Sequence, residues 1–78
     1  MSRQIYDRVF VETFDINEDD LNESLEYQSI PAWDSVGHMS LIAALEDEFE
    51  ISFEMDDVIE FGTYLSGIDT LKKYGVQI

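Results

Sequence analysis

The stretch from residue 33 to residue 49, WDSVGHMSLIAALEDEF, does most to decide the fold of this chain. Its apolar side chains recur with a period near 3.6, which predicts an amphipathic helix that begins at Asp34 or Ser35 and ends near Phe49. Aspartate and serine favour a helix N-terminus, because their side-chain oxygens accept hydrogen bonds from the free amides of the first turn. The apolar stripe of this helix consists of Val36, Met39, Leu41, Ile42, Leu45 and Phe49.

Three other segments carry the same helical spacing. A first helix ends near Phe14, a shorter one lies around Met55 to Phe61, and the last begins at Tyr64 or Leu65 and stops before Gly75. The glycine is a typical residue just beyond a helix C-terminus. The sequence therefore predicts three long helices and one short helix, the third in order.

A long polar segment separates the first two helices. It runs from Asp15 to Asp34, is rich in residues that bond their own backbone in turns, and contains Pro31, which prevents a helix there. The 78 residues are enough for one domain, so we expect a single all-α domain, 1–78, built as a four-helix bundle of mostly antiparallel long helices with a long first loop.

The charge of the chain is strongly one-sided. Eighteen acidic residues stand against four basic ones, Arg3, Arg8, Lys72 and Lys73, which gives a formal net charge of −14 at pH 7. Nucleic acids and anionic membranes are bound through lysine and arginine, so both are disfavoured as partners. Basic protein surfaces are favoured instead, although a purely solubilising role of the charge is the alternative.

The chain contains no cysteine, which excludes disulfides, thiolate catalysis and the usual structural zinc sites. Its first ten residues hold no apolar run long enough for a signal peptide or a membrane span. We therefore expect a soluble, cytoplasmic protein without membrane insertion and without a metal site.

Ser35 is the most informative polar residue. Its hydroxyl is expected at the start of the second helix, beside the long loop and outside the apolar stripe. The unpaired amides and the positive dipole end of a helix N-terminus favour a phosphodiester there. Taken alone, however, Asp34 and Ser35 are better explained as an ordinary helix cap, which is the usual role of these residue types.

Residues 33–49 resemble the signature of the acyl carrier proteins, in which Asp-Ser-Leu is followed by an apolar stripe, an acidic cluster and a phenylalanine. Length, acidity and helix order are similar over nearly the whole chain, and the resemblance is to the free-standing type II carriers rather than to peptidyl carriers. It implies a four-helix bundle of the acyl-carrier type. It also implies that a phosphopantetheinyl transferase moves 4′-phosphopantetheine from coenzyme A to Ser35. The arm's thiol would then hold acyl intermediates as thioesters for fatty-acid or specialised acyl or aminoacyl biosynthesis.

The same resemblance implies a monomer that catalyses nothing itself. Asp34 and Val36 would contact the transferase. Acyl-loading and acyl-transfer enzymes would present basic patches to an acidic surface formed by Glu46, Asp47, Asp56 and Asp57. An acyl chain would lie in a cleft between helices, and the candidates to line that cleft, which are core residues on the simpler view, are Met39, Ile42, Ala43, Phe53, Ile59 and Leu65.

Two residues depart from the carrier pattern. The usual leucine after the serine is Val36, which is a mild change, and a position that is often acidic in fatty-acid carriers is Ser40. The second change thins the negative surface near the arm. It makes a specialised carrier in a secondary-metabolite, cell-envelope or aminoacyl pathway as natural as one that serves fatty-acid synthesis.

Three rival interpretations remain at this stage. A serine hydrolase would pair Ser35 with His38 and Asp34, but all three fall within one helical turn, where they cannot align as a triad. An acidic helical interaction module without a prosthetic group would need the carboxylates but not Ser35. Trp33 fits every interpretation, either as a packing residue or as part of the rim around the arm.

A calcium site is the third rival, because the first loop has ligands with the spacing of an EF-hand. Asp20 and Asn22 replace the glycine at its sixth position and the apolar residue at its eighth, which leaves only weak divalent binding. The residues at positions 1, 3, 5, 9 and 12 of that loop are Asp15, Asn17, Asp19, Glu23 and Glu26.

Overall fold

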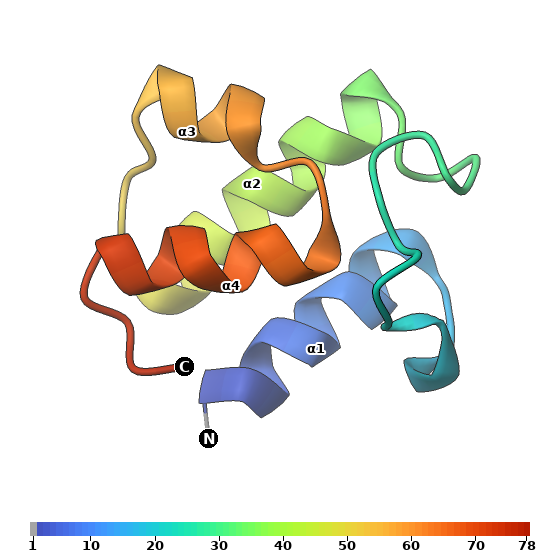
Figure 1. The fold of residues 1–78 in the computed structure, drawn as a ribbon, viewed down its shortest axis with the longest axis horizontal. Coiled ribbons are helices and arrows are strands. Elements are labelled where there is room, and N and C mark those ends of the chain that lie inside the picture. Colours follow the sequence, from blue (N-terminus) through green and yellow to red (C-terminus); the bar gives the residue numbers. More distant parts are fainter. Residues whose placement is uncertain (1) are drawn as a thin grey trace.

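A computed structural model of the chain describes residues 2–78 and is all-helical (Figure 1). In Figure 1 the first long helix runs in the opposite direction to the other two, and the short third helix lies beside the second. The predicted order of three long helices and one short one is confirmed. The helices are α1 (Ser2–Phe14), α2 (Ser35–Phe49), α3 (Met55–Glu60) and α4 (Tyr64–Lys73), with a single 3₁₀ turn, η1 (Glu18–Asp20), in the first loop.

The core is dominated by aromatic rings from α1 and the residues it packs against. Phe10 is fully buried, and its ring centroid lies between 4.9 and 5.8 Å from those of Tyr6, Phe14, Trp33 and Tyr64. Aromatic pairs at these separations add stability beyond the apolar area that they bury. Trp33 is 0% exposed and stacks on Phe14, so it is a packing residue rather than part of a rim.

The long first loop is held to the connection between α3 and α4. The Tyr27 amide donates to the Gly62 carbonyl at 2.8 Å, and the Tyr64 amide donates to the Leu25 carbonyl at 2.9 Å. These bonds form an isolated antiparallel bridge, and residues 2–78 contain no β-strand. The loop therefore follows a fixed path that brings Tyr27 toward the start of α2.

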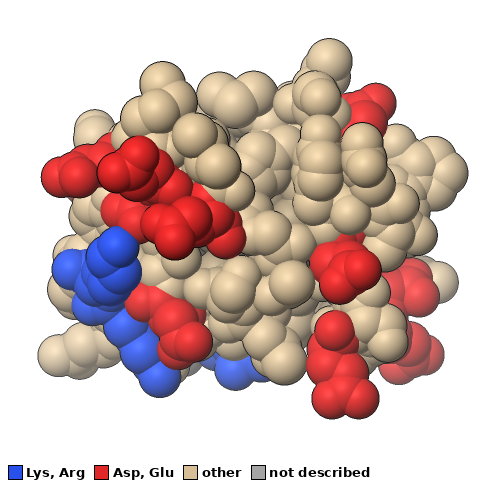
Figure 2. All heavy atoms as spheres, turned by 45° about the horizontal axis from the view of Figure 1, so that its top comes forward, with Lys and Arg blue, Asp and Glu red and all other residues tan. Residues whose placement is uncertain are grey.

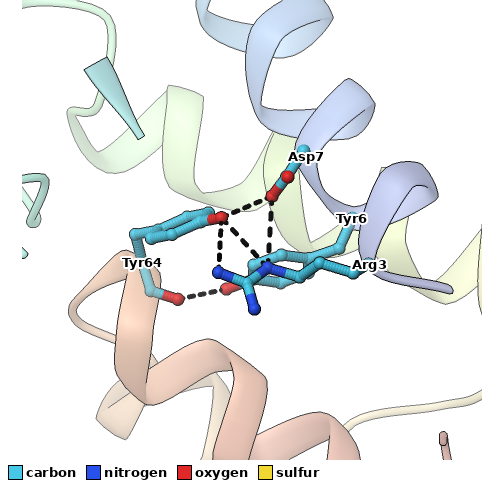
Figure 3. A network of polar contacts seen from close by, with 4 residues as sticks. All are labelled: Arg3, Tyr6, Asp7 and Tyr64. Atoms are coloured by element: carbon cyan, nitrogen blue, oxygen red, sulfur yellow. Dashed lines mark hydrogen bonds and ion pairs between the residues drawn. The ribbon is translucent and has the colours of Figure 1, made fainter. Parts of the chain in front are cut away.

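A partly buried polar network joins α1 to the start of α4 (Figure 3). The Tyr64 hydroxyl donates to an Asp7 carboxylate oxygen at 2.5 Å and accepts from the Arg3 guanidinium at 3.0 and 3.1 Å. The Tyr6 hydroxyl donates to the Tyr64 carbonyl at 2.5 Å. Burial raises the pKa of Tyr6 and, less strongly, that of Tyr64, because it disfavours the charged phenolate.

A second polar cluster fastens α3 to the end of α4. Asp57 is 7% exposed, and its carboxylate accepts from the Lys73 ammonium at 2.6 Å and from the Tyr74 hydroxyl at 2.5 Å. The same hydroxyl accepts from the Glu54 amide at 2.8 Å. Hydrogen bonds from Lys73 and Tyr74 lower the pKa of Asp57. No helix within residues 2–78 is long and apolar enough to cross a membrane.

Candidate functional site

Ser35 is the first residue of α2, and its side chain is exposed. Asp34 caps the helix, because its carboxylate accepts from the Gly37 amide at 2.8 Å. Gly37 is needed at this turn, since an added Cβ would overlap the Ala32 carbonyl oxygen. Among the described residues, neither the Ser35 nor the Val36 amide donates a hydrogen bond. These two donors can therefore serve an anion attached to the serine.

Tyr27 lies next to the serine, and sequence analysis did not single it out as a site residue. Its hydroxyl and that of Ser35 are 3.0 Å apart, which is a hydrogen bond in which either can donate. Its ring meets the His38 ring edge-on, with centroids 5.6 Å apart. No local sequence pattern marks Tyr27, because its position depends on the backbone bonds between the loop and Gly62.

An apolar pocket of about 420 Å³ opens beside Ser35. It lies between α2 and α3, and the polar side chains in its lining are those of Tyr27, Ser35 and His38. Its apolar walls include side chains that are left unusually open to solvent: Met55 and Ile59 are each 72% exposed, and Met39 is 56% exposed. Large apolar side chains gathered around one polar group are typical of small-molecule sites.

The predicted cleft residues fall in different places. Met39 and Ile59 line the pocket. Ile42 is buried in the core, and Phe53 packs edge-on against Phe61 and Tyr74. The other two, Ala43 and Leu65, are exposed and do not line the pocket.

Sequence reasoning missed Met55 and Phe61 as lining residues, for different reasons. Met55 begins α3 and Phe61 directly follows it. The sequence places both in the short helix, but it does not show that they face the pocket. A methionine that stays 72% exposed is a signal only once the structure places it beside other apolar side chains.

The six residues predicted to contact partners differ in how free they are. Asp34, Val36, Asp47 and Asp56 are exposed, and Val36 is the most exposed large apolar residue described. Glu46 is partly used inside the protein, because its carboxylate accepts from the Phe53 amide at 2.8 Å. Asp57 is engaged by Lys73 and Tyr74 and leaves little charge for a partner.

His38 lines the pocket and is half-buried, with both ring nitrogens in use. Nδ1 accepts from the Trp33 indole N–H at 3.0 Å, and Nε2 lies 2.8 Å from the Val58 carbonyl oxygen. An indole nitrogen only donates and a carbonyl only accepts, so the ring is neutral and carries its proton on Nε2. Its nitrogens bind these groups and not Ser35, so Ser35 and His38 are not paired as the nucleophile and base of a catalytic triad.

The acidic first loop does not form a cation cage. Within the described part of the chain, no three His, Cys, Asp or Glu side chains are grouped so that they could hold a metal ion. The hydrogen bonds of this loop use backbone groups at two of the EF-hand-like positions: the Asn17 backbone amide donates to the Asp20 carboxylate, and the Asp19 backbone carbonyl accepts from the Asn22 side-chain amide. Although these residues have the sequence spacing of calcium ligands, their side chains do not converge on one point in the described structure.

Comparison with protein-family models finds no match for this chain, and comparison with curated proteins finds none either. The family resemblance accordingly depends on residues 33–49 and on the helix order, read together with the geometry around Ser35.

Proposed function

We propose that this protein is an acyl carrier of the four-helix acyl-carrier type, and that Ser35 is the attachment point of its 4′-phosphopantetheine arm. The arm supplies the thiol that this cysteine-free chain lacks, and it holds acyl groups as thioesters for fatty-acid or specialised acyl or aminoacyl biosynthesis in the cytoplasm. One observation carries the proposal: an exposed serine hydroxyl at the start of α2 opens onto an apolar pocket of about 420 Å³.

The residues around Ser35 fit a phosphate-linked arm. The free amides of Ser35 and Val36 can donate hydrogen bonds to a phosphodiester on Ser35, and the positive end of the α2 dipole also favours its negative charge. The side chain of Asp34 is turned to the Gly37 amide and stays bound within its own helix turn. The apolar walls formed by Met39, Met55 and Ile59 suit a hydrocarbon chain that folds back from the arm.

The carrier supplies the nucleophile but no base. The nearest imidazole, His38, has both nitrogens engaged elsewhere, and Tyr27 offers only a neutral hydroxyl to Ser35. The phosphopantetheinyl transferase must therefore accept the serine proton as the serine oxygen attacks phosphorus and the adenosine bisphosphate part of coenzyme A leaves. A carrier that supplies only the nucleophile, while the transferase supplies the base, agrees with a protein that holds intermediates for enzymes and catalyses no step itself.

Partner recognition is expected to depend on charge. Figure 2 shows acidic side chains in separate groups on the face turned forward, with basic side chains gathered at one edge and uncharged surface between the acidic groups. Asp34 and Val36 flank the arm and would contact the transferase, and Asp47 and Asp56 are free to meet basic patches on acyl-loading and acyl-transfer enzymes. Each exposed ion pair contributes about 1 kcal/mol or less, so steering and number matter more than any single pair.

The proposal is tested by the intact mass of the protein after incubation with coenzyme A, magnesium and a broad-specificity phosphopantetheinyl transferase. Wild type should gain one phosphopantetheinyl group and Ser35→Ala none. Ser40→Ala is the matched control, because Ser40 is an exposed serine of the same helix. No addition to wild type, under conditions that modify a known carrier, would favour the acidic interaction module instead.

A further inference from the structure

His38 connects three parts of the molecule at the base of the pocket. Through Nδ1 it binds the indole of Trp33, which is fully buried, and through Nε2–H it binds the Val58 carbonyl of α3. Its ring also lies nearly parallel to the Trp33 ring and edge-on to Phe61. The side chain therefore has one orientation, fixed from both sides.

The Val58 carbonyl depends on this contact. It belongs to the last turn of α3, where carbonyl groups have no partner within the helix, and no backbone amide among residues 2–78 reaches it. The His38 N–H thus supplies the missing donor from α2. Removing it leaves a half-buried carbonyl without a protein partner, which favours movement of that end of α3 toward solvent.

The short helix α3 has two polar tethers, and they point to different neighbours. Asp57 fastens it to α4 through Lys73 and Tyr74, whereas the Val58 carbonyl fastens it to α2 through His38. The pocket lies on the α2 side, where Met55 and Ile59 are exposed. Loss of the His38 tether would therefore let α3 swing away from α2 about its attachment to α4 and widen the pocket.

We propose that His38 is a positioning residue that holds α3 over the pocket and thereby sets the length of acyl group that the pocket encloses. The inference rests on the proposed carrier function for its cargo, but the tether itself is a property of the unmodified protein. Two variants separate the hydrogen bonds from the bulk of the ring. His38→Leu removes both hydrogen-bonding nitrogens but leaves a side chain of similar size. His38→Gln removes the ring but keeps one hydrogen-bond donor and one acceptor.

The first test uses the unmodified protein and does not depend on Ser35. Trp33 is the single tryptophan, so its indole N–H gives one resolved proton signal in an NMR spectrum. His38→Leu should raise the hydrogen-exchange rate of that proton by roughly fivefold to tenfold, the change expected for loss of one hydrogen bond. His38→Gln, which keeps one donor and one acceptor, should return the exchange rate of that proton toward the wild-type value. An exchange rate that is unchanged in His38→Leu would overturn the tether.

The second test loads wild type and both variants with a series of straight-chain acyl groups, from acetyl to palmitoyl, and measures the melting temperature of each. Wild type should gain stability with chain length until the pocket is full and then gain no more. In His38→Leu that plateau should move to a longer acyl group, whereas a merely structural role would lower all melting temperatures equally. An unmoved plateau would overturn the inference, while failure of Ser35 to accept any arm would overturn the proposed function and leave the first test valid.

Discussion

Asp34 has two expected roles that single substitutions can separate. Its carboxylate caps α2 by accepting from the Gly37 amide, and its negative charge is proposed to contact the transferase. Asp34→Ala should cost about 1 kcal/mol of unfolding free energy, the usual effect of losing a helix cap, whereas Asp34→Asn should cost much less. Urea unfolding at neutral pH measures both values.

Both Asp34 variants should lower kcat/KM for the transferase if the charge is recognised. The Asp34→Asn side chain would still cap the helix, so a lower rate for this variant could not be attributed to fraying of α2. Equal rates for wild type and Asp34→Asn would show that the cap is the only role of this residue.

Gly67 shows how closely α4 packs against the core. A Cβ at this position would overlap both the Tyr6 hydroxyl and the Phe61 ring, so no side chain fits without displacing them. Gly67→Ala should lower the unfolding free energy by about 2 kcal/mol or more, because overpacking a dense core is costly. Gly62→Ala is the control, since its Cβ would meet only the Glu60 carbonyl oxygen at 3.8 Å. A mild effect at Gly67, equal to that at Gly62, would contradict this packing.

The stability of the protein at alkaline pH should depend on Tyr6. Burial raises its pKa above the ordinary value of 10.0, so its contribution is fully present below pH 10 and is lost as the pH rises toward the folded-state value. Unfolding free energies measured between pH 7 and pH 11 should therefore fall more steeply above pH 10 in wild type than in Tyr6→Phe. Parallel pH profiles for the two proteins would be inconsistent with a buried, neutral phenol.

At the level of the helices, periodicity predicts local structure but does not predict contacts between residues that are far apart in the sequence. The apolar spacing places the ends of the last three helices and the C-terminal end of the first within a residue or two of those observed, because a helix is specified by neighbours three and four residues away. It gives no start for α1, which begins at Ser2. The bridge between Glu26 and Thr63 has no such signal. It fixes the path of the loop and hence the placement of Tyr27 beside Ser35.

The candidate site and the acidic surface around it were predicted only in part, because contacts between distant segments leave no local signal in the sequence. Met39 and Ile59, two of the cleft residues that the acyl-carrier resemblance implies, lie with Ser35 at one pocket. The resemblance implies that Asp57 contacts partner enzymes, yet Lys73 at the end of α4 binds its carboxylate. Long-range pairs of this kind depend on how helices pack, and the sequence pattern of one helix does not contain that information.

The tether between α3 and α4 should be visible as an acid-sensitive part of the stability. Hydrogen bonds from Lys73 and Tyr74 lower the pKa of Asp57, so its contribution is present above the ordinary value of 3.8 and is lost as the pH falls through the lower folded-state value. The stability difference between wild type and Asp57→Asn should therefore be constant near neutrality and shrink below pH 3.8. A difference for Asp57→Asn that stays constant down to acid pH would count against the tether.

For the molecule as a whole, the net charge of −14 opposes folding by self-repulsion. Added salt screens this repulsion, and a divalent salt raises the ionic strength more per mole than sodium chloride does. The melting temperature should accordingly rise with sodium chloride concentration, and the same rise should need a lower molar concentration of magnesium chloride. A melting temperature that is flat or falls with salt would contradict this account of the charge.

The central claim is that one serine of the seven in this chain carries the arm. The most direct measurement is tandem mass spectrometry of a proteolytic digest, after treatment with coenzyme A and a phosphopantetheinyl transferase. The account predicts phosphopantetheine on the peptide that contains Ser35, localised to that serine and absent from every other peptide. An unmodified Ser35, alongside a control carrier that is fully modified, or an arm on a different serine would contradict it.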